Sequence, residues 1–216
     1  MRVIAGEARG VPLMAPPGRA TRPTSDRTKE AMFAVLGDLG CEGTVLDLFA
    51  GSGALGIEAL SRGATFCDFV ESAAPACRAI KANLQKTRLP EQGAIHQLPV
   101  ARYLAGAHRG GPEGPGGPGG PNAPYDLILL DPPYGFAGLE DLLRALGASP
   151  LVGPRTALMV EHERGRALPP RLGGLALDRS RVHGDSAFTL YLPERETVPA
   201  GARDGAGGSG GGTPGA

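Results

Sequence analysis

Three glycines follow one acidic side chain in the stretch Asp47–Gly56, which reads DLFAGSGALG. Gly51 and Gly53 can adopt backbone angles that are closed to other residues, and they let a ligand approach the main chain. Glu71 follows roughly 20 residues after the loop, where an acid can accept hydrogen bonds from both hydroxyls of a ribose. The apolar run before the loop and the helical spacing after it predict a strand, a loop and a helix whose first N–H groups face the same ligand. The stretch therefore predicts a site for a ribose-bearing cofactor.

The glycines alone do not identify the cofactor. The spacing of Gly51, Gly53 and Gly56 also satisfies the dinucleotide fingerprint, so a nicotinamide or flavin enzyme fits them nearly as well. Asp47 favours another ligand, because a carboxylate there would face a pyrophosphate badly but could accept a hydrogen bond from the ammonium group of a bound amino acid. S-adenosylmethionine carries both an amino acid and a ribose, so it satisfies Asp47 and Glu71 together.

A second stretch suited to chemistry is the tetrapeptide Asp131-Pro132-Pro133-Tyr134, directly after the apolar run Leu127–Leu130. The two prolines fix φ and remove donors, so the carbonyl of Pro132 can point into a pocket. That carbonyl and the Asp131 carboxylate can accept the hydrogens of a substrate amino group and hold its nitrogen in line with a methyl sulfonium. Tyr134 offers a flat face on which an extruded base can stack. By itself such a motif can be a rigid connection from a strand to a loop, without a role in chemistry. Its occurrence together with the predicted cofactor site at Asp47–Gly56 favours the functional interpretation.

Three consecutive segments must position the glycine-rich loop: a strand at Thr44–Phe49, a helix at Ala54–Ser61 and a strand at Phe66–Glu71. Together they predict one βαβ crossover. Two late apolar runs, 175–177 and 187–192, have no helix-length sequence between them and should form an antiparallel hairpin. Further expected elements are helices at Pro75–Thr87 and Leu139–Leu146 and strands at Ala94–Leu98, Leu127–Leu130 and Thr156–Glu161.

These elements predict an α/β, Rossmann-like fold with a mostly parallel central sheet, a C-terminal antiparallel hairpin and a small N-terminal extension. Ligands in open α/β sheets bind at the carboxyl ends of the strands. The glycine-rich loop, Glu71 and the Asp131–Tyr134 motif all follow strands, so we expect them to meet at one edge of the sheet.

The chain divides into three regions. Residues 1–40 should form an arm, built as a hairpin or an extended segment, followed by a helix that starts near Pro23–Ser25. Residues 41–194 should form the main domain. Glycine and proline dominate 106–124 and 195–216, which cannot bury enough apolar surface to offset the entropy of ordering, so we expect both to be disordered.

The net charge of the 216-residue chain is zero, but basic residues are concentrated near its start. We expect this surface to contact the phosphates of a nucleic acid, with an ordinary solvated surface as the alternative. The candidate contacts are Arg2, Arg9, Arg22, Arg27 and Lys29.

Three cysteines without paired spacing argue against a disulfide framework or a zinc site, so no metal is expected. There is no apolar run of about 18 residues and no signal-peptide core, so we expect a cytoplasmic protein without a membrane partner.

Several motifs taken together resemble one known family, the RsmD methyltransferases of bacteria, which use S-adenosylmethionine to modify the exocyclic amine of a guanine in 16S ribosomal RNA. The resemblance spans nearly the whole chain except its two Gly/Pro-rich segments. DPPY alone is shared with DNA adenine methyltransferases. The specificity of the resemblance to the RsmD family therefore rests on the two amino-terminal motifs. The motifs are RVIAGEARG, RPTSDRTKEAMF, DLFAGSGALGIEALSRGA, DPPY and HGDSAFTLYL.

This resemblance implies a class I S-adenosylmethionine-dependent methyltransferase fold and, as partner, 16S ribosomal RNA within an assembling or assembled small subunit. It implies that Asp131–Tyr134 hold the target amine and base. Many methyltransferases of this fold carry a polar side chain after the third strand, where this sequence has Leu98, Pro99 and Val100. Adenine would then be contacted by main-chain groups or by another residue. The implied cofactor residues are Asp47, Phe49, Ala50, Gly51, Ser52, Gly53, Glu71, Pro99 and Val100.

Three other functions compete with RNA guanine methylation. A DNA adenine methyltransferase usually needs a target-reading region, which 106–124 is too poor in side chains to supply. A nicotinamide oxidoreductase would use the GSGALG loop and leave DPPY as a coincidence. A non-catalytic RNA-binding module would use only the basic arm.

Overall fold

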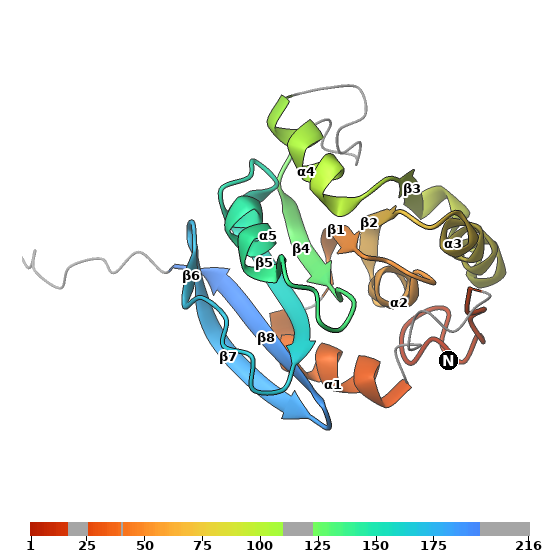
Figure 1. Ribbon diagram of the computed structural model, residues 1–216. Coiled ribbons are helices and arrows are strands. Elements are labelled where there is room, and N and C mark those ends of the chain that lie inside the picture. Colours follow the sequence, from red (N-terminus) through yellow and green to blue (C-terminus); the bar gives the residue numbers. More distant parts are fainter. Residues whose placement is uncertain (17–25, 40, 110–122, 195–216) are drawn as a thin grey trace, which may run out of the picture.

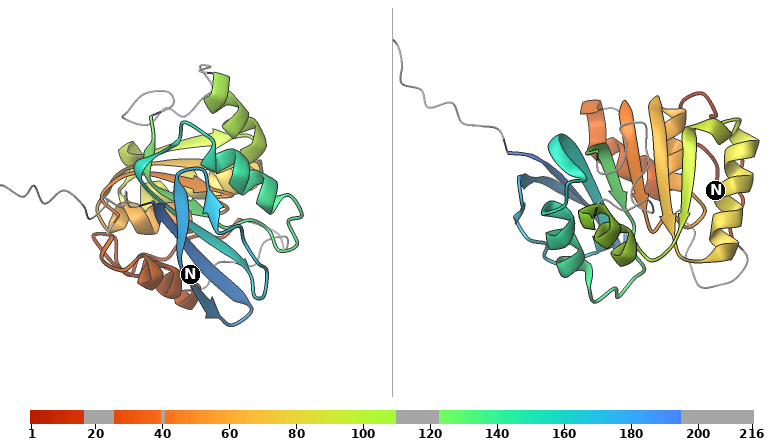
Figure 2. Two further views of the ribbon diagram at one scale, coloured as in Figure 1. Left: turned by 90° about the vertical axis from the view of Figure 1, so that its left-hand side faces the viewer. Right: turned by 90° about the horizontal axis from the view of Figure 1, so that it is seen from above.

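The computed structural model describes residues 1–16, 26–39, 41–109 and 123–194. These residues form one mixed sheet with helices on both faces, as Figures 1 and 2 show. The predicted α/β architecture is confirmed. The tail 195–216 and most of the glycine-rich segment lie outside the described residues.

The sheet has eight strands in the order β3-β2-β1-β4-β5-β8-β7-β6. The first five strands in this order are parallel, and β8 pairs antiparallel with β5 and with β7. The predicted C-terminal hairpin is therefore confirmed. The strands are β1 (Gly43–Leu48), β2 (Ala64–Glu71), β3 (Gly93–Gln97), β4 (Tyr125–Leu130), β5 (Val152–Glu163), β6 (Arg171–Leu172), β7 (Leu175–His183) and β8 (Ser186–Pro193).

Helices cover the two faces of the sheet in separate groups. Met32 of α1, Leu55 of α2 and Ile80 of α3 belong to one buried cluster, whereas Tyr103 of α4 and Leu143 of α5 belong to the other. The sheet lies between these two cores, so its parallel strands are apolar on both faces. The helices are α1 (Asp26–Leu36), α2 (Ala54–Ser61), α3 (Ala74–Thr87), α4 (Val100–Arg109) and α5 (Leu139–Gly147), with short 3-10 turns at Gly37–Leu39 and Pro90–Gln92.

Helix α4 was not expected from the sequence. It runs through Arg109, so the prediction of disorder is wrong for residues 106–109. The helix buries Val100, Tyr103 and Leu104 against the sheet. Packing of this apolar face overrides the poor helix propensity of Gly106, which lies inside the helix. Residues 110–122 lie outside the described part of the chain.

The first residues form the expected hairpin and are fastened to α2. The N–H of Val3 donates to the Val11 carbonyl at 3.0 Å, and Arg2 and Pro12 form an antiparallel bridge. The hydroxyl of Ser61 donates to the Ala5 carbonyl at 2.6 Å and accepts from the N–H of Ala8 at 2.9 Å. The arm therefore packs on the helix that follows the glycine-rich loop (Figure 1).

Gly6 explains why the arm can approach α2 so closely. Its φ is +81°, and a Cβ atom at this position would lie 1.6 Å from the carbonyl oxygen of Ser61. Only glycine fits both the backbone angle and the contact.

Among the helices of the described ranges, none is long and apolar enough to cross a bilayer. Within the same ranges, no three His, Cys, Asp or Glu side chains gather as metal ligands would. The thiols of Cys41, Cys67 and Cys77 are buried and free.

Candidate functional site

The loop between β1 and α2 has a tightly constrained backbone. Phe49, Gly51 and Gly53 all have positive φ, at +62°, +57° and +77°. A bulky residue with positive φ is uncommon and is held in place by its surroundings. The N–H of Gly53 donates to the Ala50 carbonyl at 2.7 Å, and the N–H of Ala50 donates to the Val70 carbonyl of β2 at 3.1 Å. The turn is thus closed on itself and tied to the next strand.

Asp47 lies beneath this loop, near the end of β1, and is 1% exposed. Its Oδ2 accepts a hydrogen bond from the N–H of Gly56 at 2.9 Å, which satisfies a donor in the first turn of α2. Its Oδ1 has no hydrogen-bond partner among the described residues. Burial raises the pKa of the Asp47 carboxyl to about 7, against the lowering effect of the Gly56 bond, and the charge of Glu71 adds to the rise. One buried acceptor oxygen is therefore available at the start of the loop.

Gly56, the third glycine of the predicted fingerprint, serves packing. A Cβ atom there would lie 2.4 Å from a ring carbon of Phe69 and 2.6 Å from the Cys67 sulfur. Both neighbours are on β2, so the glycine lets α2 lie close against that strand, as the fingerprint requires of its last glycine.

Glu71 ends β2 beside the glycine-rich loop. Its Oε2 accepts from the N–H of Gly51 at 2.9 Å, and its Oε1 accepts from the N–H of Ala73 at 2.8 Å. The main-chain carbonyl of Ser52 accepts from the Asn83 side chain at 2.9 Å, which ties the loop to α3. The tertiary structure therefore brings Asp47, the loop at 49–53 and Glu71 together at the carboxyl edge of the sheet.

Of the two residues expected near adenine, Pro99 precedes α4 and Val100 begins it. Pro99 is exposed, and its carbonyl accepts from the N–H groups of Arg102 and Tyr103 at 2.9 and 3.1 Å. The Val100 side chain is 6% exposed and belongs to the core. At Val100, only the main chain remains as a candidate for ligand contact.

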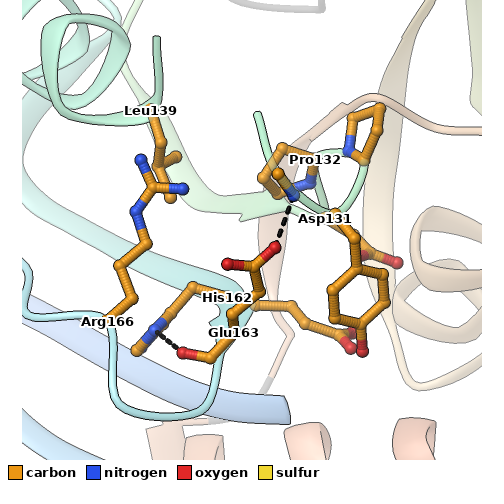
Figure 3. A pocket seen from close by; sticks show the side chains of 10 residues that line it. Asp131, Pro132, Leu139, His162, Glu163 and Arg166 are labelled. Carbon is orange, nitrogen blue, oxygen red and sulfur yellow. Dashed lines mark hydrogen bonds between the residues drawn. The ribbon is translucent and has the colours of Figure 1, made fainter. Parts of the chain in front are cut away.

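The Asp131–Tyr134 motif forms one wall of a pocket beyond the end of β4 (Figure 3). The Tyr134 side chain is 51% exposed, so its ring face is available for stacking. The opposite wall comes from the end of β5 and the turn after it, which was not expected from the sequence. The two glutamates at the end of that strand, Glu161 and Glu163, were the available signal. The lining residues are Asp131, Pro132, Pro133, Tyr134, Gly135, Leu139, Glu161, His162, Glu163 and Arg166.

A chain of hydrogen bonds joins the two walls. The hydroxyl oxygens of Tyr134 and Ser186 lie 2.6 Å apart, and the Ser186 hydroxyl donates to Glu161 Oε1 at 2.7 Å. Because that donation uses the only proton of Ser186, the Tyr134 hydroxyl must donate to Ser186. Ser186 and Glu161 are each 7% exposed. The carboxylate therefore sets the direction of both hydroxyl groups.

Three further contacts hold the loop after Tyr134. The Glu163 carboxylate accepts from the N–H of Gly135, and the Arg166 guanidinium donates to the Phe136 carbonyl at 3.0 Å. The Phe136 ring packs edge-on against Phe49, with centroids 5.4 Å apart. This aromatic pair joins the glycine-rich loop to the Asp131–Tyr134 loop.

His162 lies between two acids but is held by neighbouring polar groups. Its Nδ1 is 3.0 Å from the Glu163 carbonyl, and its Nε2 is 2.8 Å from the Thr189 hydroxyl. Burial lowers the pKa of His162. A neutral imidazole with both nitrogens engaged fixes the wall of the pocket and is poorly placed to take a proton from a substrate.

One predicted RNA contact is wrong. Lys29 is fully buried, its ammonium lies 3.0 Å from Glu58 Oε2, and it also donates to the Arg2 carbonyl. The arm covers this face of α1, which helical periodicity within α1 could not reveal. Glu58 accepts from the N–H groups of Ile4 and Ala5 as well, so Lys29 and Glu58 fasten the arm to α2.

The other basic candidates lie in different settings. Arg9 and Arg27 are exposed. The Arg2 side chain is 66% exposed and its Nε lies 3.3 Å from the Asp26 carboxylate. Arg22 lies outside the described residues.

The sheet order and the site together define a class of protein. A glycine-rich loop follows β1, an acid ends the neighbouring β2, and antiparallel β8 lies beside β5 in an otherwise parallel half-sheet. This is the Rossmann-like class I methyltransferase fold. A nicotinamide-binding doubly wound sheet would instead continue with parallel strands.

Comparison with known proteins identifies the family. The family model described as "Conserved hypothetical protein 95" matches residues 1–192, and the chain belongs to that family. YlbH of Bacillus subtilis (strain 168) is 36% identical over 191 residues, spanning 88% of this chain and 98% of YlbH. Ribosomal RNA small subunit methyltransferase D of Escherichia coli (strain K12) is 29% identical over 196 residues, spanning 91% of each chain. The resemblance to the RsmD family is confirmed.

A solved structure shares the whole architecture. A hypothetical protein from Thermus thermophilus is 31% identical, with a TM-score of 0.71, and the match covers 90% of this chain and 99% of that one.

Proposed function

We propose that this protein transfers a methyl group from S-adenosylmethionine to the exocyclic 2-amino group of a guanine in 16S ribosomal RNA of the small subunit. The observation that carries the proposal is the meeting of two sites at one edge of the sheet. The cofactor loop and the loop that carries Asp131–Tyr134 touch through the Phe49–Phe136 ring pair. Relatives named for methylation of small-subunit ribosomal RNA match the chain along nearly its whole length.

The residues around the loop fit S-adenosylmethionine. Asp47 Oδ1 is a buried acceptor without a protein partner among the described residues, which suits the ammonium of a bound amino acid. Beside Gly51 the space is open, with only the Phe49 carbonyl oxygen within 4 Å of a Cβ position, at 3.9 Å. Asp47 and the loop at 49–53 would hold the methionine end, Glu71 the ribose, and the main chain at Pro99 and Val100 the adenine. When bound, the cofactor supplies an electrophilic methyl group.

The chain's own groups position the amine. Asp131 and the Pro132 carbonyl would accept its two hydrogens, which directs the nitrogen lone pair toward the cofactor side of the pocket. Tyr134 would stack on the base, with its ring held by Ser186. The product nitrogen is cationic and acidic, so a carboxylate of ordinary basicity or water suffices to take its proton.

Basic residues on the arm and α1 would bind the RNA backbone. We assign this role to Arg2, Arg9, Arg22 and Arg27 and withdraw Lys29, which is buried. The hydrogen bonds of the arm to Ser61 would hold Arg2 and Arg9 in a fixed position relative to α2, the helix that follows the cofactor loop. The substrate would be the RNA within an assembling or assembled small subunit.

The test is incubation of the purified protein with labelled S-adenosylmethionine and small subunits that lack the modification, followed by nucleoside analysis. We expect label in guanosine methylated on its 2-amino group. Label in adenosine, or transfer to DNA in preference to RNA, would contradict the proposal, and so would binding of a nicotinamide dinucleotide without binding of S-adenosylhomocysteine.

A further inference from the structure

β7 has an open edge for most of its length. One side pairs with β8 along the strand, but β6 pairs only with Leu175 and Ala176 on the other side. Residues 177–183 are all exposed, although they belong to a regular strand. Such an edge presents side chains and unpaired main-chain groups to the surroundings.

Two rows of paired residues connect this edge to the pocket. Glu161 of β5 lies opposite Phe188 of β8, which lies opposite Arg181 of β7. In the next row, Glu163 lies opposite Ser186, which lies opposite His183. Directly opposed residues in antiparallel strands project from the same face. Arg181 and His183 therefore lie on the same face as the pocket acids, two strand spacings away, which is about 10 Å.

The charges along this face change sign. The pocket is lined by the carboxyl groups of Asp131, Glu161 and Glu163 and by the single guanidinium of Arg166, so acidic groups predominate and would repel a phosphate. Beyond them, Arg164 and Arg181 are exposed and have no ion-pair partner among the described residues. Arg179, in contrast, is paired with Asp178. Exposed guanidinium groups without an ion-pair partner among the described residues therefore lie beyond the predominantly acidic pocket.

Arg164 lies in the turn that follows β5. Its main-chain N–H donates to the Asp185 carbonyl at 2.9 Å, which joins the turn after β5 to the turn between β7 and β8. The two turns meet beside Ser186, whose hydroxyl contacts the Tyr134 hydroxyl. A base stacked on Tyr134 would thus leave its sugar and flanking phosphates over these turns.

We propose that Arg164, Arg181 and His183 form a second RNA-binding surface, the β7 surface, which holds backbone phosphates next to the nucleotide that enters the pocket. This inference rests on the proposed function and adds to it, because the sequence pointed only to the amino-terminal arm. α1 packs against β7 and β8, so exposed Arg27 and the β7 surface lie on the same side of the sheet. The strand of RNA would cross from one to the other over the pocket.

A competing explanation is that charged side chains on β7 merely prevent edge-to-edge association. Salt dependence separates the two, because each phosphate contact that is lost lowers the slope of log affinity against log salt by roughly 0.7 to 0.9. The experiment measures binding of the full chain to protein-free 16S ribosomal RNA and to small subunits lacking the modification, across a range of potassium chloride concentrations. The variants are R164A, R181A and, as a charge-matched control, K86A. Lys86 is exposed in the last turn of α3, at the end remote from the site.

We expect R164A and R181A each to flatten the salt dependence by about one contact with both ligands, and K86A to leave it unchanged. Binding of S-adenosylhomocysteine should stay at the parent value in all three, which verifies folding. Unchanged slopes in R164A and R181A would overturn the inference while leaving the proposed function intact. A change seen only with assembled subunits would also overturn it, because the contact would then be with a ribosomal protein. Failure of the parent to bind either ligand would contradict the proposed function itself.

Discussion

The hydroxyl of Tyr134 lies 2.6 Å from the hydroxyl of Ser186, although the two residues are separated by 52 positions in the chain. Tyr134 belongs to the loop after β4, whereas Ser186 begins β8. The aromatic ring of the DPPY motif is therefore oriented by the C-terminal hairpin. This relationship makes the hairpin part of the site as well as part of the sheet.

Removing that hydrogen bond should weaken RNA binding more than turnover. Y134F and S186A should each raise KM for the subunit by several-fold, because the ring remains but is free to turn. The double variant Y134F/S186A should behave like S186A, because S186A already removes the bond that Y134F removes and also the bond from Ser186 to Glu161. Steady-state kinetics check this, and strictly additive effects would show that the two hydroxyls act separately.

The aromatic ring of Tyr134 should contribute more to methyl transfer than its hydroxyl group does. Base–aromatic stacking contributes on the order of 1–3 kcal/mol, so Y134A should lose roughly tenfold to 100-fold in kcat/KM relative to the parent. The measurement is single-turnover methyl transfer over a range of subunit concentrations. Equal behaviour of Y134A and Y134F would contradict a stacking role.

Asp131 should support transfer without supporting cofactor binding. D131A should lower the single-turnover rate on the order of 100-fold to 1,000-fold, because it removes an acceptor preorganised for the amine. D131N should retain more activity than D131A, since an amide oxygen still accepts a hydrogen bond. Binding of S-adenosylhomocysteine should stay within a few-fold in both variants. D141A on α5, which removes an exposed acid, serves as the control. If D131A transfers the methyl group at nearly the parent rate, Asp131 has only a structural role at the end of β4.

Asp47 should make cofactor binding depend on pH. Burial raises the pKa of its carboxyl to about 7 in the free protein, whereas an ammonium ligand favours the ionised form. Affinity for S-adenosylhomocysteine should be level above that pKa and fall by at most about tenfold per unit below it. Calorimetry near pH 6 in buffers of different protonation enthalpy should detect proton release on binding. D47N should bind more weakly and lose this pH dependence.

The same group should affect the stability of the ligand-free protein. The pKa of Asp47 is higher in the folded state, about 7, than its ordinary value of 3.8, so the protonated carboxyl stabilises the fold fully below that ordinary value. This contribution is lost as the pH rises from there to about 7. Thermal unfolding of D47N should vary less over this range than that of the parent. An identical pH profile would show that Asp47 ionises normally.

Substitution of Lys29 should affect the stability of the fold, whereas substitution of Arg27 should affect RNA binding, although the two residues are near neighbours on α1. K29A removes the ammonium partner of the buried Glu58 carboxylate, which still has the Arg62 guanidinium 2.9 Å away. The variant should therefore lose less unfolding free energy than the roughly 3–5 kcal/mol that a fully unpaired buried charge costs. R27A should leave the melting temperature unchanged and flatten the salt dependence of RNA binding by roughly one contact. Denaturant titration checks the expectation for K29A, and salt-dependent binding assays check the expectation for R27A. A stable K29A variant would contradict the buried ion pair.

Local features of the chain made much of this fold predictable. Glycines at 51 and 53 and the two prolines at 132–133 restrict the backbone directly, so the loop after β1 and the exit from β4 could be placed without knowing the rest. Alternation and apolar runs located the parallel strands, and the short gap between the last two runs predicted their hairpin. α4 escaped detection because a weak helix former is stabilised there by burial of Tyr103 and Leu104, which only the assembled core provides.

The sequence by itself determined which residues could contact the cofactor and the amine, because both motifs are contiguous and each follows a strand. The tertiary structure alone decided what surrounds them. Pairing of β5 with β8 brings Glu161 and Ser186 to Tyr134, and folding of the arm over α1 buries Lys29. The physical reason is that burial and strand pairing depend on segments that are distant in the sequence. A lysine on a helix is exposed or buried according to whether another segment of the chain packs on that face of the helix.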